Sequence, residues 1–203
     1  MPAAAGGSNA AMPALVLAST SPYRRALLAR LRVPFDTDPP GVDEAAVKRV
    51  ADSPEAAVRE LARRKALAVA ARHAGAVVIG SDQCAAIDGR ILDKPGSPAA
   101  AREQLRLLQG NEHRLLTAVA IAHAGPLIEW TDSTRLHMRP LLPDEIERYV
   151  AADSPLDCAG SYKIEGLGIA LFDRIEGEDQ TAIMGLPLLR LCRELRALGV
   201  AVP

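Results

Sequence analysis

Hydrophobic and polar positions along the chain follow two different periods, and each period predicts one type of secondary structure. Short apolar or alternating runs are typical of strands, and they lie at 16–18, 76–82, 114–123 and 126–138. Apolar positions three and four residues apart are typical of amphipathic helices, and they lie at 22–31, 54–73, 97–110, 143–153 and 187–199. Because strands and helices alternate but hairpins intervene, we expect an α/β fold with a mixed sheet.

Turn residues mark the boundaries between these segments. The Pro- and Asp-rich stretch 36–44 predicts a loop, and the segment 83–92 predicts a hairpin that turns at Asp88-Gly89. Residues 156–177 mix strand-like positions with glycine turns. The chain has 203 residues and neither an internal repeat nor a long linker. We therefore expect a flexible extension over residues 1–12 and a single domain over residues 13–203.

The first predicted strand runs into a helix start that is rich in hydrogen-bond donors. Ser21 suits the N-cap, and the proline that follows suits the first helical position. The free backbone N–H groups at such a helix start favour an anion. The side chains that add hydroxyls or positive charge are Ser19, Ser21, Arg24 and Arg25. A capped surface helix with solvated arginines gives the same pattern, so this stretch alone leaves both interpretations open.

Lys65 interrupts the apolar face of the helix predicted over 54–73. At about 100° per residue, it falls near the centre of the face formed by Val58, Leu61, Ala62, Ala66 and Val69. A lysine on such a face either extends its amine to solvent or points into a polar cleft lined by carboxylates or phosphates. The helical pattern does not distinguish between these two interpretations.

Acidic residues and further lysines stand at the ends of the predicted segments. Glu44 ends the 36–44 loop, and Asp82 ends the strand 76–82, a place where α/β proteins often hold ligand groups. Carboxylates suit Mg²⁺, with Mn²⁺ as an alternative, and a carboxylate beside such an ion can orient and deprotonate water. Lys94 and Lys163 are further candidates for anion binding. Taken singly, each of these acids is better explained as a cap or a solvated loop residue and each lysine as a solvated side chain; the combined set favours a site.

Composition and missing motifs exclude several classes of protein. The net charge of −1 and the aromatic content of 3% argue against a nucleic-acid partner. No apolar run is long enough for a membrane span. The three cysteines, Cys84, Cys158 and Cys192, are widely spaced and favour a reducing, cytoplasmic location. The chain contains no P-loop and no dinucleotide-binding glycine motif. It also contains no zinc-protease motif and no nucleophile elbow.

Taken together, the motifs resemble those of the Maf family of nucleoside triphosphate pyrophosphatases. LASTSPYRRALL, VDE, RRKALA, IGSDQ, DKP and CAGSYKIEG occur in that order along the chain. The resemblance extends from about residue 13 to the C-terminal helix. It implies an α/β fold like that of inosine triphosphate pyrophosphatases, with a mixed twisted sheet, flanking helices and two lobes around a deep cleft. It also implies a homodimer and metal-dependent hydrolysis between the α- and β-phosphates of a nucleotide.

The resemblance implies roles for particular residues as well. Asp82, Glu44, Lys65 and Lys94 match catalytic motifs, with Asp82 as the proton acceptor. We predict that Glu44 and Asp82 hold the metal ion. Ser19, Ser21, Arg24 and Arg25 are the predicted phosphate-binding residues.

Base specificity is predicted to rest on Tyr23, Gln83 and Glu165, a set that most resembles the branch cleaving 7-methyl-GTP. An aromatic face attracts a cationic methylated base, and a carboxylate accepts hydrogen bonds from the guanine edge. Two positions depart from this pattern: Tyr23 replaces an expected tryptophan, and Asp93 replaces the glycine before the Lys-Pro pair. The alternatives are a dTTP or UTP pyrophosphatase of the same family and a nucleotide-binding regulator of cell division.

Overall fold

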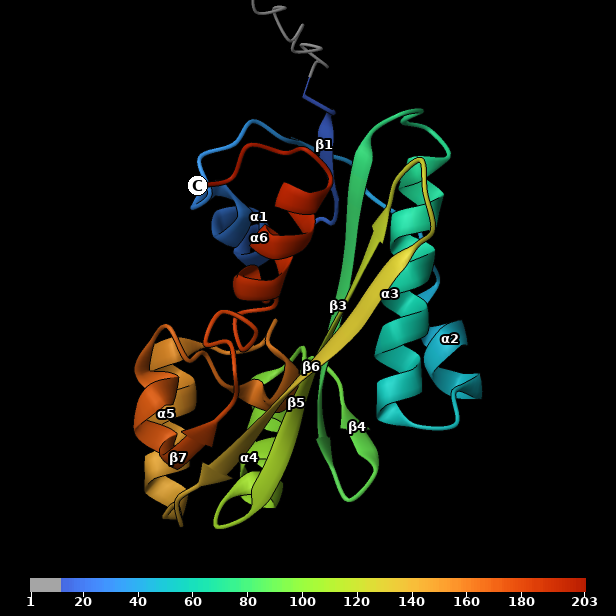
Figure 1. The fold of residues 1–203 in the computed structure, drawn as a ribbon. Helices are drawn as coiled ribbons and strands as arrows, with labels where there is room; N and C mark the ends of the chain where they lie inside the picture. The colour runs from blue at the N-terminus through green and yellow to red at the C-terminus, as the bar shows by residue number, and fades with distance from the viewer. Residues whose placement is uncertain (1–11) are drawn as a thin grey trace, which may run out of the picture.

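Three long strands form the centre of the sheet in the computed structural model, which describes residues 12–203 (Figure 1). They are β3 (Val77–Ile87), β5 (Glu112–Ala122) and β6 (Ile128–Met138). Four shorter strands complete the seven-stranded sheet of the described residues: β1 (Leu15–Ala18), β2 (Asp36–Thr37), β4 (Arg90–Leu92) and β7 (Phe172–Glu176). β1 pairs parallel with β2 and β3, and the other pairs are antiparallel. The predicted α/β fold with a mixed sheet is therefore confirmed.

Helices cover both faces of this sheet. They are α1 (Pro22–Ala29), α2 (Glu44–Val50), α3 (Pro54–Ala70), α4 (Pro98–Leu108), α5 (Pro143–Asp153) and α6 (Leu188–Ala197), with short 3₁₀ helices η1 (Ala159–Ser161) and η2 (Leu167–Leu171). Figure 1 shows α1 and α6 at one end of the long strands and α4 and α5 at the other, with α3 on the opposite face. Three helices start in the same way, because Ser21, Ser53 and Ser97 each cap a helix that begins with proline.

The alternation of side chains along β3 divides the core among these layers. Val77 and Ile79 join the apolar cluster under α1 and α6, whereas Val78 and Cys84 join the cluster under α3. Beyond the middle of the strand, Ala85 belongs to a third cluster with α4 and α5. The two clusters on one face of the sheet therefore define two lobes, and the middle of β3 lies between them.

The structure differs from the sequence-based expectations at two boundaries and in two unpredicted elements, and the reasons are tertiary. Asp82 does not end a strand, because β3 continues through it to residue 87. The loop predicted over 36–44 contains β2, and the unpredicted helix α2 begins at Glu44 with Asp43 as its N-cap. The helix predicted over 54–73 ends at Ala70. Strand pairing and docking decide these points, and local periodicity does not report them.

The predicted extension over residues 1–12 lies, apart from Met12, outside the described residues. The single domain over residues 13–203 stays a prediction, with all described strands in one sheet. Within residues 12–203, every helix is too short or too polar to span a membrane.

Gly80 lets α3 approach β3 closely, and replacing it with alanine should destabilise the protein. A Cβ atom at this position would lie 2.3 Å from the carbonyl oxygen of Ala62 and 2.5 Å from the amide nitrogen of Ala66. Both are backbone atoms of α3, so the helix itself would have to move. We expect Gly80→Ala to lower the free energy of unfolding by at least about 2 kcal/mol, measured by urea denaturation.

A glycine in the turn between β5 and β6 provides the matched control. A Cβ atom on Gly125 would meet the side chain of His123, which can rotate away by giving up only the exposed hydrogen bond that its Nδ1 accepts from the Gly125 N–H. Equal losses of stability for Gly80→Ala and Gly125→Ala would contradict the close-approach argument.

Candidate active site

A cleft of about 360 Å³ opens beside the middle of β3. β1 pairs with one edge of β3 over 77–80, and β4 pairs with the same edge over 85–87. Among the described strands, none pairs with this edge between them. The gap faces the end of β1 and the start of α1, and residues from both lobes line it. The deep cleft predicted between two lobes is therefore present.

The start of α1 forms one wall of the cleft, as the donor-rich sequence indicates. The Ser19 hydroxyl accepts a hydrogen bond from the Ser21 N–H at 3.1 Å, and the Ser21 hydroxyl accepts one from the Arg24 N–H at 3.4 Å. Both hydroxyls keep their own protons available for an acceptor in the cleft. Arg24 Nε donates to the carbonyl oxygen of Gly185 at 3.0 Å, which orients the guanidinium. This wall therefore presents convergent donors to an anion.

The structure separates the remaining predicted anion-binding residues into two groups. Lys94 lines the cleft from the segment after β4. Arg25 is exposed and lies outside the cleft lining, because one residue of α1 rotates the side chain by about 100° from Arg24. Lys163 lies outside the cleft lining: its Nζ donates to the carbonyl oxygens of Asp153 and Ser154 and is 3.8 Å from Oδ1 of Asp157, a residue of the cleft. Arg24 and Lys94 are thus brought to the cleft, whereas Arg25 and Lys163 are not.

A lysine and two carboxylates meet at the floor of the cleft. Lys65 Nζ lies 2.6 Å from Glu44 Oε1 and 2.6 Å from Asp82 Oδ1. Lys65 and Asp82 are only 5% and 4% exposed, so their charges interact in a largely water-free environment. Of the two interpretations of Lys65, the one with a polar cleft is confirmed. Asp82 faces α3 because even-numbered residues of β3 point to that side of the sheet.

Glu44 stays ionised in this cluster. Partial burial raises the pKa of its carboxyl, but Lys65, Lys48 and Arg24 outweigh this effect and hold the pKa below its ordinary value. The ion pair with Lys65 contributes stability that is present near neutral pH. That contribution is lost when the pH falls through the lowered pKa of Glu44.

The second oxygen of Asp82 has a different environment from the first. Asp82 Oδ2 is buried and has no hydrogen-bond partner among residues 12–203. A buried carboxylate oxygen without a partner is costly unless a water molecule or a cation satisfies it. Among the described residues, no group of three or more His, Cys, Asp or Glu side chains could hold a metal ion. A metal at this cluster would therefore take its remaining ligands from water and substrate.

Gln83 points to the opposite face of β3 from Asp82. Its amide nitrogen donates to the carbonyl oxygens of Ala182 and Ile183 at 2.8 and 3.0 Å, and to Thr117 Oγ1 at 2.9 Å. With the amide nitrogen held in this way, the amide oxygen of Gln83 remains as an acceptor beside the cleft. The predicted specificity residue is therefore rigidly oriented.

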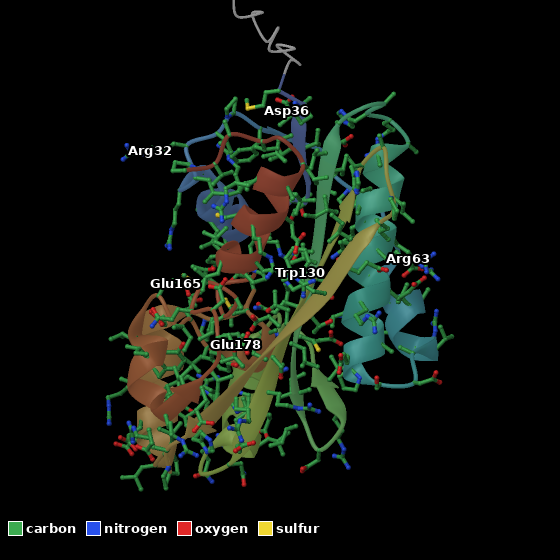
Figure 2. All side chains as sticks on the ribbon, in the orientation of Figure 1. Arg32, Asp36, Arg63, Trp130, Glu165 and Glu178 are labelled. Atoms are coloured by element: carbon green, nitrogen blue, oxygen red, sulfur yellow. The ribbon has the colours of Figure 1, made fainter. Side chains whose placement is uncertain are left out.

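Tyr23 and Glu165 line the cleft from opposite lobes. The phenol of Tyr23 donates to Asp157 Oδ2 at 3.1 Å, so α1 is tied to the segment that follows α5. Burial, Cys158 and Asp157 raise the pKa of Tyr23, and the phenol remains a donor at neutral pH. Glu165 is exposed and lies beyond the end of α5, on the side that faces α1 and α6 (Figure 2). The three residues that are predicted to set base specificity thus share one cleft.

Two further charged residues of the cleft, Lys48 and Asp157, did not stand out in the sequence. Lys48 lies one helical turn after Glu44, so predicting α2 would have placed both on one side of a helix. Asp157 precedes Cys158 in a segment without regular periodicity. Burial raises the pKa of the Cys158 thiol to about 11. Because the thiolate is the reactive form of cysteine, this environment disfavours Cys158 as a nucleophile.

Comparisons with known proteins agree with the family resemblance that the sequence motifs indicate. The model of a family described as "Maf-like protein" matches residues 14–198. A protein of Xanthomonas oryzae pv. oryzae named 7-methyl-GTP pyrophosphatase is 50% identical over 192 residues, which cover 95% of this chain and 100% of that protein. A protein of the same name from Pseudomonas aeruginosa is 46% identical over 198 residues, covering 95% of this chain and 100% of that protein.

Among solved structures, a HAM1 protein from Coxiella burnetii matches with a TM-score of 0.40 and 14% identity, over 63% of this chain and 73% of that one. The family match extends over most of the chain, and the relatives match along their whole length. This chain belongs to the Maf-like protein family.

Proposed function

We propose that this protein is a nucleoside triphosphate pyrophosphatase that hydrolyses 7-methyl-GTP to 7-methyl-GMP and pyrophosphate. The observation that carries the proposal is the near-full-length identity of 46–51% to relatives that bear the name 7-methyl-GTP pyrophosphatase. The cleft supports it independently, because it combines an anion-binding wall with a cluster of two carboxylates and a lysine.

The buried oxygen of Asp82 suits the role of proton acceptor. A water molecule on Asp82 Oδ2 would donate one proton to the carboxylate as its oxygen attacks a phosphorus atom of the α–β anhydride. The new P–O bond replaces the bond to the bridging oxygen, which leaves with one of the two products. Lys65, Arg24 and Lys94 would stabilise the charge that develops on the leaving group.

The residues at the floor of the cleft also fit a divalent metal ion, which we propose to be Mg²⁺. Glu44 and Asp82 would hold it, Asp82 by way of a bound water molecule, so that Oδ2 stays free to accept a proton; the unpartnered Oδ2 is the observation that favours this site. Mg²⁺ usually binds through one or two carboxylates, with water and substrate phosphates completing its shell. When bound, it would neutralise phosphate charge and lower the pKa of bound water. A homodimer and a cytoplasmic location remain predictions from the sequence.

Base recognition is proposed to involve Tyr23, Gln83 and Glu165. The ring of Tyr23 offers a π-face to the cationic methylated base. Glu165 would accept hydrogen bonds from the guanine N1–H and exocyclic amine, and the oxygen of Gln83 provides a further acceptor. A site that pairs these donors rejects bases that lack them.

A pyrophosphate-release assay with Mg²⁺ against 7-methyl-GTP, GTP, dTTP, UTP, CTP and ITP tests the proposal. We expect the highest kcat/KM for 7-methyl-GTP. Glu165→Gln should lower kcat/KM for 7-methyl-GTP by about 10-fold or more, because the amide presents a donor to the guanine edge. The control is Glu178→Gln, an exposed residue outside the cleft lining. Preference for dTTP or UTP would keep the reaction and reject the base assignment, whereas a folded protein inactive on every nucleotide would favour a binding regulator.

A further inference from the structure

Lys48 is a charged residue of the cleft for which the proposed reaction has so far no role. It lies on α2 one turn after Glu44, so both side chains project from the same side of the helix. Both line the cleft, and the side chain of Lys48 is 22% exposed. Its neighbour Arg49 is exposed and lies outside the cleft lining. The helix therefore directs one of two adjacent cations toward the substrate site.

The partner of Lys48 lies on another wall of the cleft. Lys48 Nζ is 2.5 Å from Asp93 Oδ1, and Asp93 comes between β4 and Lys94. The carboxylate of Asp93 is 62% exposed, so solvent screens the pair and its net contribution is small. A phosphate group with several charged oxygens is a stronger acceptor for an ammonium than one solvated carboxylate. Lys48 can therefore exchange Asp93 for a phosphate at low cost.

The other cationic side chains at the floor of the cleft are held more firmly by their hydrogen-bond partners. Lys65 is buried between Glu44 and Asp82, and Arg24 is held by the carbonyl oxygen of Gly185. Partial burial lowers the pKa of Lys48, but Asp93, Asp82 and Glu44 outweigh it and raise the pKa above its ordinary value. Lys48 is thus a permanent donor and not a base.

We propose that Lys48 binds the triphosphate of the substrate and that Asp93 holds it in a resting position until the nucleotide enters. This inference rests on the proposed nucleotide pyrophosphatase activity and adds to it a phosphate-binding residue with its competitor. Because Lys48 would contact phosphate and not the base, it contributes equally to every nucleotide. Asp93 competes with the substrate for the same ammonium group.

Steady-state kinetics of wild type and four variants test the inference. Lys48→Met should lower kcat/KM about 10- to 100-fold for both 7-methyl-GTP and GTP, with the ratio between them unchanged. Lys48→Arg should retain most of the activity, because it keeps the charge. Asp93→Asn should lower KM by about 2- to 5-fold with kcat unchanged, because the competing charge is gone. Arg49→Met, the adjacent control on the same helix, should match wild type.

Three results would overturn the inference. The first is a Lys48→Met enzyme within two-fold of wild type, and the second is an Asp93→Asn enzyme with a raised KM. The third is a loss of kcat/KM in Lys48→Met that also occurs in Arg49→Met, or that comes with a lowered melting temperature. Either result would indicate a structural role for Lys48. A wild type that hydrolyses none of the nucleotides would reject the proposed function, and with it this inference. If the wild type is active and Lys48→Met has the same activity, this inference alone is rejected.

Discussion

Asp82→Asn is expected to lower kcat by about 1,000-fold or more while leaving the protein folded. Asparagine keeps the size of the side chain and can still accept the hydrogen bond from Lys65. It cannot take a proton from water at neutral pH, and general-base catalysis contributes about 10²- to 10⁴-fold. Lys65 keeps its second partner, Glu44. The measurement is pyrophosphate release from 7-methyl-GTP, with circular dichroism and thermal unfolding to verify the fold.

The matched control for this variant is Asp179→Asn. Asp179 is also a buried carboxylate, 4% exposed, but its oxygens accept hydrogen bonds from Thr181 and, at the start of α6, from the N–H of Leu189. Its substitution should cost stability and leave kcat near that of wild type. Turnover by a folded Asp82→Asn protein at a rate close to wild type would reject Asp82 as the proton acceptor.

Lys65→Met is expected to reduce both activity and stability. Methionine preserves the apolar stem of the side chain, but it leaves the carboxylates of Glu44 and Asp82 without their shared cation. Removing one partner of a buried ion pair costs about 3–5 kcal/mol, because the remaining charge is uncompensated. We expect the free energy of unfolding to fall by about 3 kcal/mol. This value is at the lower end of the range because Glu44 is half-exposed. Urea denaturation measures it.

A double variant separates loss of charge balance from loss of packing. Lys65→Met combined with Asp82→Asn removes the buried charge together with its partner, so part of the lost stability should return. Arg64→Met is the adjacent control on α3, because Arg64 is exposed and pairs with Glu60 within the same helix. A double variant no more stable than Lys65→Met alone would contradict the charge argument.

Residues whose roles depend on local chemistry were predictable from the sequence. The serine caps and prolines at the starts of α1 and α4 place those helices within a residue or two. The helical period puts Lys65 on the buried face of α3 before any partner is known. The order of the short motifs implies the family, since each motif is weak alone and the set is specific.

Residues whose roles depend on tertiary contacts were not predictable in this way. Neighbours such as Arg24 and Arg25 have the same chemistry, and only the docking of α1 decides which one faces the cleft. Lys48 acquires its partner from a residue 45 positions away. The polar end of the run 76–82 suggests a strand end, yet β3 continues through Asp82 because β5 pairs with it there and Lys65 compensates the buried charge.

The sequence by itself therefore determined the mixed α/β class, most helix starts, the family and the chemical types of residue that the cleft holds. The fold class and the helix starts follow from periodicity and capping, which act within a few residues of the chain. The family and the residue types of the cleft follow from the resemblance of short motifs in their order along the chain. Only the tertiary structure decided which side chains meet. The gap between β1 and β4 along one edge of β3 depends on strand pairing between distant segments. Such pairing brings Glu44, Lys65 and Asp82 within hydrogen-bond distance, and no local pattern records that distance.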